Sequence, residues 1–333
     1  MIRVLSDMRR AWPAAVLALA VAFGGHVATA ATPPAAWAPS HVPMPVHKVG
    51  PHSYYVQGAL QEASHTNEGF IANAGFVITG EGVVVFDSLG SPALADQLIG
   101  EIRKRTRQPI KLVIISHDHA DHFYGIPAFH RIGAKVWTNV QARAYLESAA
   151  AGERLAQRMA LLGPWLGPDF KLPLPDRWLD RDVTFRMGQV SFQVRHVGPA
   201  HSPEDTAMLV EPDGVLYSGD VVYAGRVPFI GDANTRLWLK AIDRLLAIPA
   251  RVMVPGHGPA SWHPRRDAQL TREYLTFLRE QMGKAVQNFE TFDQAYAAVD
   301  WSRFKAEPTF GVANRRNAYN VYLEMEQEML EGK

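Results

Sequence analysis

Short apolar runs alternate with longer amphipathic stretches along most of the chain. From Tyr54 onward, the short runs are bounded by Gly, Pro, Asn or Asp, which is the pattern of β-strands separated by turns. This pattern predicts strands at 54–58, 73–79, 83–86, 111–115, 135–137, 183–186, 190–196, 207–210, 215–218 and 252–254.

The intervening stretches carry apolar residues at helical spacing. Leu94, Leu98 and Ile102, for example, follow one another at intervals of four and therefore share one face of a helix. The same criterion predicts helices at 91–106, 141–159, 235–246, 265–288, 292–299 and 316–330, with a proline-rich loop at 163–168. Strands interleaved with helices indicate a layered α/β fold.

The first thirty residues have the composition of a signal peptide. Arg3, Arg9 and Arg10 form a basic start, an apolar stretch follows at 12–23, and Ala28-Thr29-Ala30 is a small-residue cleavage signature. The apolar stretch is shorter than the ~20 residues of a membrane-spanning helix. We therefore expect a periplasmic or secreted protein with no stable membrane span after cleavage. Residues 31–53 are expected to be an extended lead-in, and 54–333 a single domain.

The charge and cysteine content exclude several classes of function. Removing residues 1–30 takes away three arginines and Asp7, so the formal charge falls from +1 by 2 to −1. Nucleic-acid-binding proteins usually carry a basic patch, and the only notable Lys/Arg run is Arg103-Lys104-Arg105, so we expect no nucleic-acid partner. The chain has no cysteine, which excludes disulfides, thiolate ligands and a cysteine nucleophile.

A dense cluster of histidines directly follows the predicted strand at 111–115. His117, His119 and His122 are interleaved with Asp118 and Asp121. Imidazole nitrogens and carboxylate oxygens are ligands that suit zinc, and a tight loop after a strand directs several of them to one point. The cluster predicts a metal site.

Three further candidate ligands occupy similar positions later in the chain. His201, Asp220 and His257 each follow an apolar strand and a glycine-bearing turn. Each one alone would more often cap a turn or face solvent. Their order along the chain carries more information than any single one.

Together these segments resemble the ligand pattern of the metallo-β-lactamase superfamily, His117-x-His119-x-Asp121-His122 followed by His201, Asp220 and His257. The resemblance covers roughly residues 54–263. It implies an αβ/βα four-layer sandwich, in which two sheets lie face to face with helices outside, and a binuclear metal centre at one edge of the sheets.

The resemblance also implies individual roles. One metal would be held by His117, His119 and His201, the other by Asp121, His122 and His257, with Asp220 bridging the two. The expected cofactor is two Zn²⁺ ions, with a single iron as the alternative. Water bound to zinc has a pKa near ~7, so a hydroxide nucleophile would be available at neutral pH. Asp121 is expected to act in catalysis by taking a proton or steering that hydroxide.

Several other residues are candidates for supporting roles. Asp87, at the end of the strand 83–86, is expected to hold the histidine loop from behind, although an ordinary turn aspartate is an equal alternative. Asp118, between two ligands, is expected to support them or to face solvent. Four aromatic residues are candidates for the walls of a substrate pocket, although a core position is commoner for each: Tyr124, Trp165, Phe229 and Trp262.

The type of the bridging residue separates branches of this superfamily. Asp220 stands where β-lactamases of the first two subclasses have cysteine, and Ser218-Gly219-Asp220 resembles the glyoxalase II, lactonase and nuclease branches instead. Segments 67–76, 116–125 and 218–232 are most similar to exported metallohydrolases associated with sulfur-oxidation and quinoprotein systems. Glyoxalase II relatives usually have two glycines where this chain has Phe123-Tyr124, which argues against a glutathione thioester substrate.

The leading hypothesis is an exported binuclear zinc hydrolase that attacks the thioester, ester or lactone carbonyl of a small molecule. Hydrolysis of β-lactams and oxidation of sulfur compounds at a single iron are the enzymatic alternatives. A metal-binding accessory or sensor protein is the non-enzymatic one. The sequence does not indicate an oligomeric state.

Overall fold

The computed structural model describes residues 36–332, which belong to one compact unit. The predicted signal peptide lies outside these residues. Within this part of the chain, every helix is either too short or too polar to cross a membrane.

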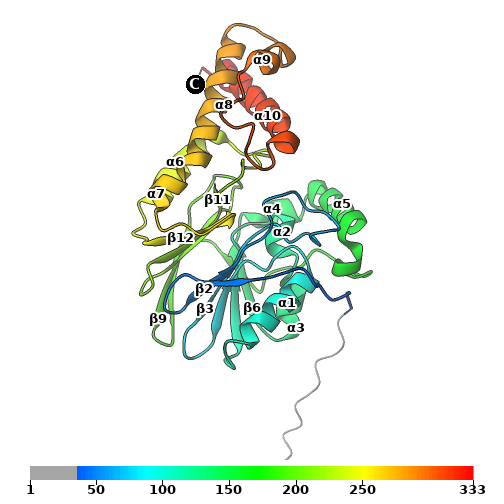
Figure 1. Cartoon of the computed structure of the whole chain (residues 1–333), viewed down its shortest axis with the longest axis vertical. Helices are drawn as coiled ribbons and strands as arrows, with labels where there is room; N and C mark the ends of the chain where they lie inside the picture. Colours follow the sequence, from blue (N-terminus) through cyan, green and yellow to red (C-terminus); the bar gives the residue numbers. More distant parts are fainter. Residues whose placement is uncertain (1–35, 333) are drawn as a thin grey trace, which may run out of the picture. The chain divides into compact units, whose positions relative to one another are not determined.

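The first sheet contains seven strands that follow one another in chain order (Figure 1). Strands β1 to β4 are antiparallel, and β4 to β7 are parallel because helical connections return the chain to the same edge. Their bounds are β1 Val46–Lys48, β2 Ser53–Val56, β3 Ala74–Ile78, β4 Val83–Phe86, β5 Ile110–Ile114, β6 Lys135–Asn139 and β7 Arg177–Leu179.

The second sheet contains five strands in the order β12-β11-β10-β9-β8. Four of them form an antiparallel meander, and the last strand, β12, joins parallel to β11 after a helical crossover. Their bounds are β8 Val183–Met187, β9 Val190–His196, β10 Thr206–Val210, β11 Val215–Tyr223 and β12 Val252–His257.

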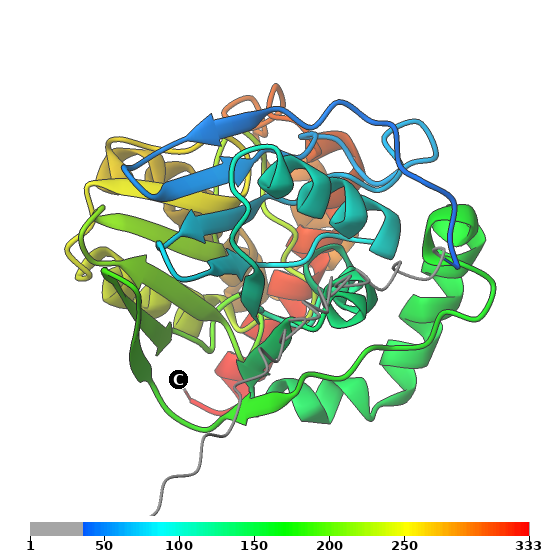
Figure 2. The ribbon, with the colours of Figure 1, turned by 90° about the horizontal axis from the view of Figure 1, so that it is seen from below.

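Helices cover the outer face of each sheet (Figures 1 and 2). The group beside the first sheet consists of α1 Pro92–Arg103, α2 Ala120–Phe123, α3 Ile126–Arg131, α4 Ala142–Leu146 and α5 Ala149–Leu166. The second group consists of α6 Thr235–Leu246, which connects β11 to β12, and of the helices that follow β12: α7 Pro264–Asp267, α8 Gln269–Gln287, α9 Phe292–Ala298 and α10 Phe310–Leu330.

The burial of strand β4 explains this layering. Val83 and Val85 pack against the helices of the first group, whereas Val84 and Phe86 pack against the second sheet. Successive side chains of a strand point to opposite faces, so an entirely apolar strand requires a cover on both sides. The expected αβ/βα sandwich is confirmed.

The lead-in and four helical segments differ from the sequence-based expectation. The predicted helix 141–159 is interrupted after Leu146 and divides into α4 and α5. Residues 46–48 of the predicted lead-in form the edge strand β1. The predicted loop at 163–168 is largely helical: α5 kinks at Leu162 and continues to Leu166, with Pro164 in the first turn after the kink, where no N–H is needed. The predicted helix 265–288 is divided at Ala268 into α7 and α8, and α10 begins at Phe310 rather than near 316.

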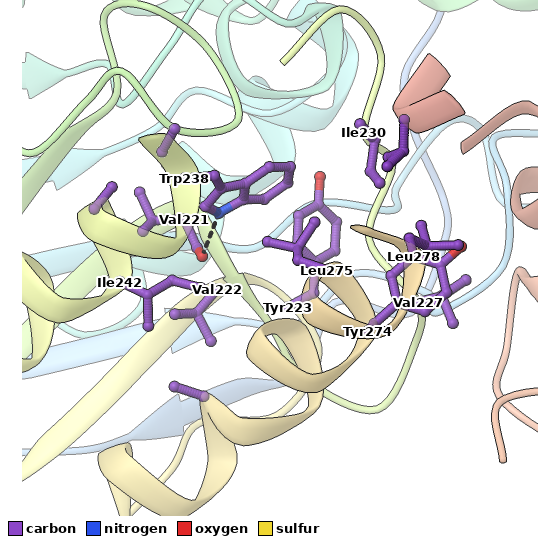
Figure 3. Packing of buried hydrophobic residues seen from close by; sticks show 14 of the residues in the cluster. Val221, Val222, Tyr223, Val227, Ile230, Trp238, Ile242, Tyr274, Leu275 and Leu278 are labelled. Atoms are coloured by element: carbon purple, nitrogen blue, oxygen red, sulfur yellow. Dashed lines mark hydrogen bonds between the residues drawn. The ribbon is translucent and has the colours of Figure 1, made fainter. Parts of the chain in front are cut away.

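The outer face of the second sheet packs against α6 and α8 through large buried side chains. Trp238 of α6 is fully buried, and its indole N–H donates to the carbonyl of Val221 at 3.0 Å (Figure 3). Tyr274 and Leu275 of α8 lie in the same cluster. Burying each such side chain contributes roughly 1.5–3 kcal/mol. Tyr223, at the end of β11, belongs to this core (Figure 3).

Candidate metal centre

The seven predicted ligands come from four places in the fold. The loop after β5 and the short helix α2 supply His117, His119, Asp121 and His122. The remaining three are His201 in the loop after β9, Asp220 within β11, and His257 at the end of β12. The structure brings all seven together at one edge of the two sheets.

The first predicted set lies within ligand distance of a common point. The ring nitrogens of His117, His119 and His201 lie within 4.8 Å of one another. His201 Nε2 is 2.7 Å from His119 Nδ1, a contact that either a shared proton or a shared cation accounts for. Three imidazoles around an ion leave positions open for water or substrate, as in catalytic zinc sites.

The second set is equally close. One ligand atom each of Asp121, His122 and His257 lies within 4.8 Å of the other two, and His257 Nε2 is 3.4 Å from Asp121 Oδ2.

Asp220 lies between the two sets. Its Oδ2 is 3.4 Å from His201 Nε2 and 3.3 Å from His257 Nε2, so one carboxylate faces a histidine of each set. Its Oδ1 is 3.2 Å from His122 Nε2.

Several of these atoms are buried without a hydrogen-bond partner among the described residues. His117 Nε2, His122 Nε2 and Asp220 Oδ1 are all in this condition. A buried polar atom without a partner is costly, and a cation that several such atoms could coordinate would remove the cost. The residues therefore fit divalent metal ions held by nitrogen and oxygen.

The protonation of the ligands favours metal binding for most of them. Burial lowers the pKa of His119 to about 4 and that of His201 to about 3, so both rings are neutral, which is the form that ligates metal. Burial alone would raise the pKa of Asp121, but His122 and His257 hold it well below its usual value.

His122 differs from His119 and His201. Burial opposes its protonation, but Asp220 and Asp87 raise its pKa well above the usual value. A metal must therefore displace a proton from this ring.

A network centred on Asp87 supports the histidine loop from behind. Asp87 Oδ2 lies 2.9 Å from His122 Nδ1, and Asp87 Oδ1 accepts from the Ser116 N–H at 2.7 Å. The Ser116 hydroxyl also donates to Asp87 Oδ2 and lies 2.9 Å from His117 Nδ1. Asp87 thus orients two ligands, one directly and one through Ser116, as acceptors behind metal-binding histidines do.

Aromatic packing supports the ligands of the second sheet. The Tyr223 ring stacks on His257 with centroids 5.0 Å apart, and the Tyr223 hydroxyl donates to Asp220 Oδ2. The Trp238 ring meets His201 edge-on with centroids 5.2 Å apart. His257 Nδ1 also lies 2.7 Å from the backbone carbonyl oxygen of Ile71.

Two glycines allow Asp220 and His257 to approach each other. A Cβ on Gly256 would lie 1.8 Å from Asp220 Oδ1, well inside van der Waals contact. Gly219 has φ +53°, and a Cβ there would lie 2.7 Å from the Cβ of Ser116. Neither position has room for a side chain.

The ligands open into a cleft of roughly 540 Å³, a volume that includes the open space at its mouth. Phe229, one of the four predicted wall residues, lines it, 6.4 Å from His119 between ring centroids. The other walls are Glu62, Ile71, Ala120, Tyr223 and three arginines, Arg154, Arg158 and Arg226.

The other three aromatic candidates do not line this cleft. Tyr124 is buried against Phe123 and Phe170. Trp165, on α5, packs against His65, and Trp262 is largely exposed. Tyr124 and Trp165 serve the core of the first helical layer, which is the commoner position for large aromatic residues.

Asp118 lies in a buried acidic group and contacts neither Asp87 nor a ligand ring by a hydrogen bond. Its backbone N–H donates to Glu204 Oε1 at 2.9 Å. Burial and the neighbouring Glu204 raise the pKa of Asp118 to about 10, so its carboxyl keeps a proton at neutral pH. That contact fastens the histidine loop to the segment that carries His201.

Tyr223, Ser116 and the three arginines were not predicted from the sequence. Ser116 and Tyr223 lie one and three residues from a ligand, and this proximity is the signal that could have identified them. The spacing of Arg154 and Arg158 places them on one helix face, but it does not indicate which face meets the cleft.

Comparisons with known proteins agree with this geometry. The family model described as metallo-beta-lactamase superfamily matches residues 67–257. A linear primary-alkylsulfatase of Pseudomonas sp. (strain ATCC 19151) is 24% identical over 60% of this chain and 44% of its own length. The metallo-beta-lactamase type 2 of Elizabethkingia meningoseptica is 23% identical over 64% of this chain and 78% of its own length. The chain thus spans less than half of the first relative.

Solved structures show the same fold at low identity. A metallo-beta-lactamase from Pontibacter korlensis superimposes with a TM-score of 0.56 at 23% identity, covering 70% of this chain and 99% of that one. An inverting sec-alkylsulfatase from Pseudomonas sp. gives 0.65 at 18% identity, covering 84% of this chain and 50% of that one. With its ligand cluster and two-sheet sandwich, this chain belongs to the metallo-β-lactamase superfamily, whose members include metal-dependent hydrolases.

Proposed function

We propose that the protein is an exported binuclear zinc hydrolase that acts on a thioester, ester or lactone of a small molecule. The observation that carries the proposal is the position of Asp220, which faces His201 on one side and His257 on the other. A shared carboxylate at that point suits two ions close together. The composition of residues 1–30 supports export.

Two zinc ions, when bound, would supply hydroxide at neutral pH and withdraw charge from the substrate carbonyl. The chain's own residues would then control protons and position. Asp121 lines the cleft, stays ionised, and is able to accept a proton from the attacking water or steer it. The Tyr223 hydroxyl, whose pKa is raised by burial and by Asp220, keeps its proton and orients that carboxylate.

β-Lactam hydrolysis is the second candidate, favoured by the match to the type 2 enzyme of Elizabethkingia meningoseptica over most of that protein. Metal analysis followed by a panel of a β-lactam, a lactone, an aryl ester and a thioester separates the two. Two zinc equivalents with turnover of the last three support the proposal. A single iron ion in the protein, or turnover of the β-lactam alone, would contradict the proposal.

Asp121→Ala tests the assigned site directly. We expect kcat to fall at least about 1,000-fold and one zinc equivalent to be lost, because the substitution removes both a ligand and the proton acceptor. Zinc content by mass spectrometry and ester turnover measure both effects. Asp180→Ala, at a side chain that is 71% exposed, is the matched control. An active Asp121→Ala protein with two zinc ions would contradict the assignment.

A further inference from the structure

Helix α5 places two arginines on the wall of the cleft. Arg154 and Arg158 are one helical turn apart and both line the space above the ligands. Arg158 Nη2 lies 4.0 Å from Asp121 Oδ1, and the Arg158 side chain is 16% exposed. Arg154 is close enough to His119 for its charge to disfavour protonation of that ring.

The carboxylates of the cleft do not offset these two charges once metal is bound. Glu62 pairs with Arg226 at 3.2 Å, and Arg226 also lies over the Tyr223 ring. Asp121 and Asp220 face the histidines and would share their charge with the ions. Within residues 36–332, no carboxylate lies within 4.0 Å of Arg154. The metal-loaded cleft would therefore carry excess positive charge.

We propose that Arg154 and Arg158 form a subsite for an anionic group of the substrate, a carboxylate or a sulfate close to the bond that is hydrolysed. A guanidinium binds such planar or tetrahedral anions through paired N–H donors. The 4.0 Å approach of Arg158 to Asp121 sets the anion next to the reacting group. The inference rests on the proposed function and narrows its substrate to anionic esters.

A purely structural role explains the pair less well. An arginine that served only to neutralise Asp121 would account for Arg158 but not for Arg154. An arginine whose only role is to keep the protein soluble is normally exposed on the surface, whereas Arg154 and Arg158 are both partly buried and line the cleft. A positive cleft also attracts anions from a distance and raises their association rate.

The test compares esters that differ in one charge. Mono-4-nitrophenyl succinate and 4-nitrophenyl butyrate share a leaving group and a chain length, but only the first carries a carboxylate. For the R154Q/R158Q double variant we expect the ratio of kcat/KM for succinate over butyrate to fall by about 30-fold or more, as the loss of charged hydrogen bonds predicts. R154K/R158K should recover part of the ratio because it keeps the charge.

The matched control is R181Q/R186Q, which removes the same charge from exposed residues outside the cleft wall. Its ratio should stay within about twofold of the parent protein. 4-Nitrophenyl 3-sulfopropanoate is the third substrate, because it keeps the same ester and places a sulfonate, which resembles a sulfate, where the succinate ester has its carboxylate. A higher kcat/KM for it than for the succinate ester assigns the subsite to a sulfate-like anion, and the reverse assigns it to carboxylate. An unchanged ratio in R154Q/R158Q protein with full zinc content would overturn the inference.

Failure of the proposed function is recognised separately. If the zinc-loaded parent protein hydrolyses none of the esters, that function is wrong, and the subsite is tested by calorimetry with N-phenylsuccinamate against neutral N-phenylbutanamide. Binding of the anion that is lost in R154Q/R158Q but not in R181Q/R186Q supports the subsite. Equal binding by all three proteins refutes it.

Discussion

The ligands from the two sheets are held in place in different ways. Those after β5 are held by hydrogen bonds: Asp87 accepts from His122 and from the Ser116 hydroxyl, and that hydroxyl in turn contacts His117. Those of the second sheet have fewer such contacts, from the Ile71 carbonyl to His257 and from the Tyr223 hydroxyl to Asp220, and rely more on aromatic packing, with His201 against Trp238 and His257 against Tyr223. Hydrogen bonds fix the orientation and basicity of a ring, whereas packing fixes its position. Metal binding by the ligands after β5, the hydrogen-bonded half of the site, should therefore be sensitive to changes of charge. Metal binding by the ligands of the second sheet, the packed half, should be sensitive to changes of side-chain volume.

Gly256→Ala should have the largest effect on metal content and turnover, because it adds a methyl group to the packed half of the site, where no space remains. The added methyl would lie 1.8 Å from Asp220 Oδ1, so Asp220 or His257 must move. We expect loss of at least one zinc equivalent and a fall in kcat of about 1,000-fold or more, since ~1 Å of misplacement alone costs about 100-fold. Metal content and ester turnover measure this. Gly152→Ala, on α5 with open space around it, is the control and should retain both.

Asp87→Asn should have the next largest effect and tests the hydrogen-bonded half. Asp87 has φ +65°, which asparagine tolerates, so the substitution removes charge with little backbone strain. We expect zinc affinity to weaken by about 10- to 100-fold, as is typical when an acceptor behind a histidine ligand is lost. Competition with a fluorescent chelator measures the affinity. Zinc binding as tight as that of the parent would show that Asp87 does not tune the ligands.

Trp238→Phe should affect stability more than turnover. The substitution removes volume beside His201 and the hydrogen bond to Val221, so we expect a loss of about 2 kcal/mol in the free energy of unfolding. Turnover should fall only a few-fold because the ligands remain. Urea unfolding and ester turnover measure the two effects. A 100-fold loss of turnover at unchanged stability would mean that Trp238 acts on the chemistry itself.

Asp118→Asn should have the smallest effect on turnover, but it should change how the free energy of unfolding depends on pH. Its folded pKa, about 10, is above the unfolded value, so its stabilising contribution is complete below pH ~4 and is lost as the pH rises toward 10. One proton gives a slope of at most about 1.4 kcal/mol per pH unit. Urea unfolding of the metal-free protein at several pH values should show this decline, and Asp118→Asn should flatten it. An unchanged slope would assign the proton elsewhere, for example to Asp205.

Much of this arrangement was predictable from local sequence, and the exceptions depend on tertiary contacts. The bounds of β4, β9 and α6 follow directly from apolar periodicity. The seven candidate ligands converge because the segments that carry them meet at one edge of the two sheets. The extent of β11 differs from the prediction: the predicted strand ends at residue 218, whereas β11 continues through Asp220 to Tyr223. The continuation of α5 past Pro164 was not predictable, since a kink at Leu162 lets the helix resume.

The walls of the cleft were the least predictable part. The local pattern of an aromatic residue is the same whether its side chain faces the core or the cleft. The sequence therefore could not show that Phe229 lines the cleft while Tyr124 packs inside. The direction of Arg154 and Arg158 depends on how α5 docks against α1 and α2, and no local periodicity encodes that docking.

Helix α5 carries none of the seven candidate ligands, and it lies in the connection between β6 and β7. The residues that would catalyse hydrolysis and the residues that would select the substrate thus belong to separate stretches of the chain. Exchanging a few side chains on this one helix would redirect the enzyme's selectivity while its reactive centre stays untouched, a division of labour by which one scaffold can acquire many substrates.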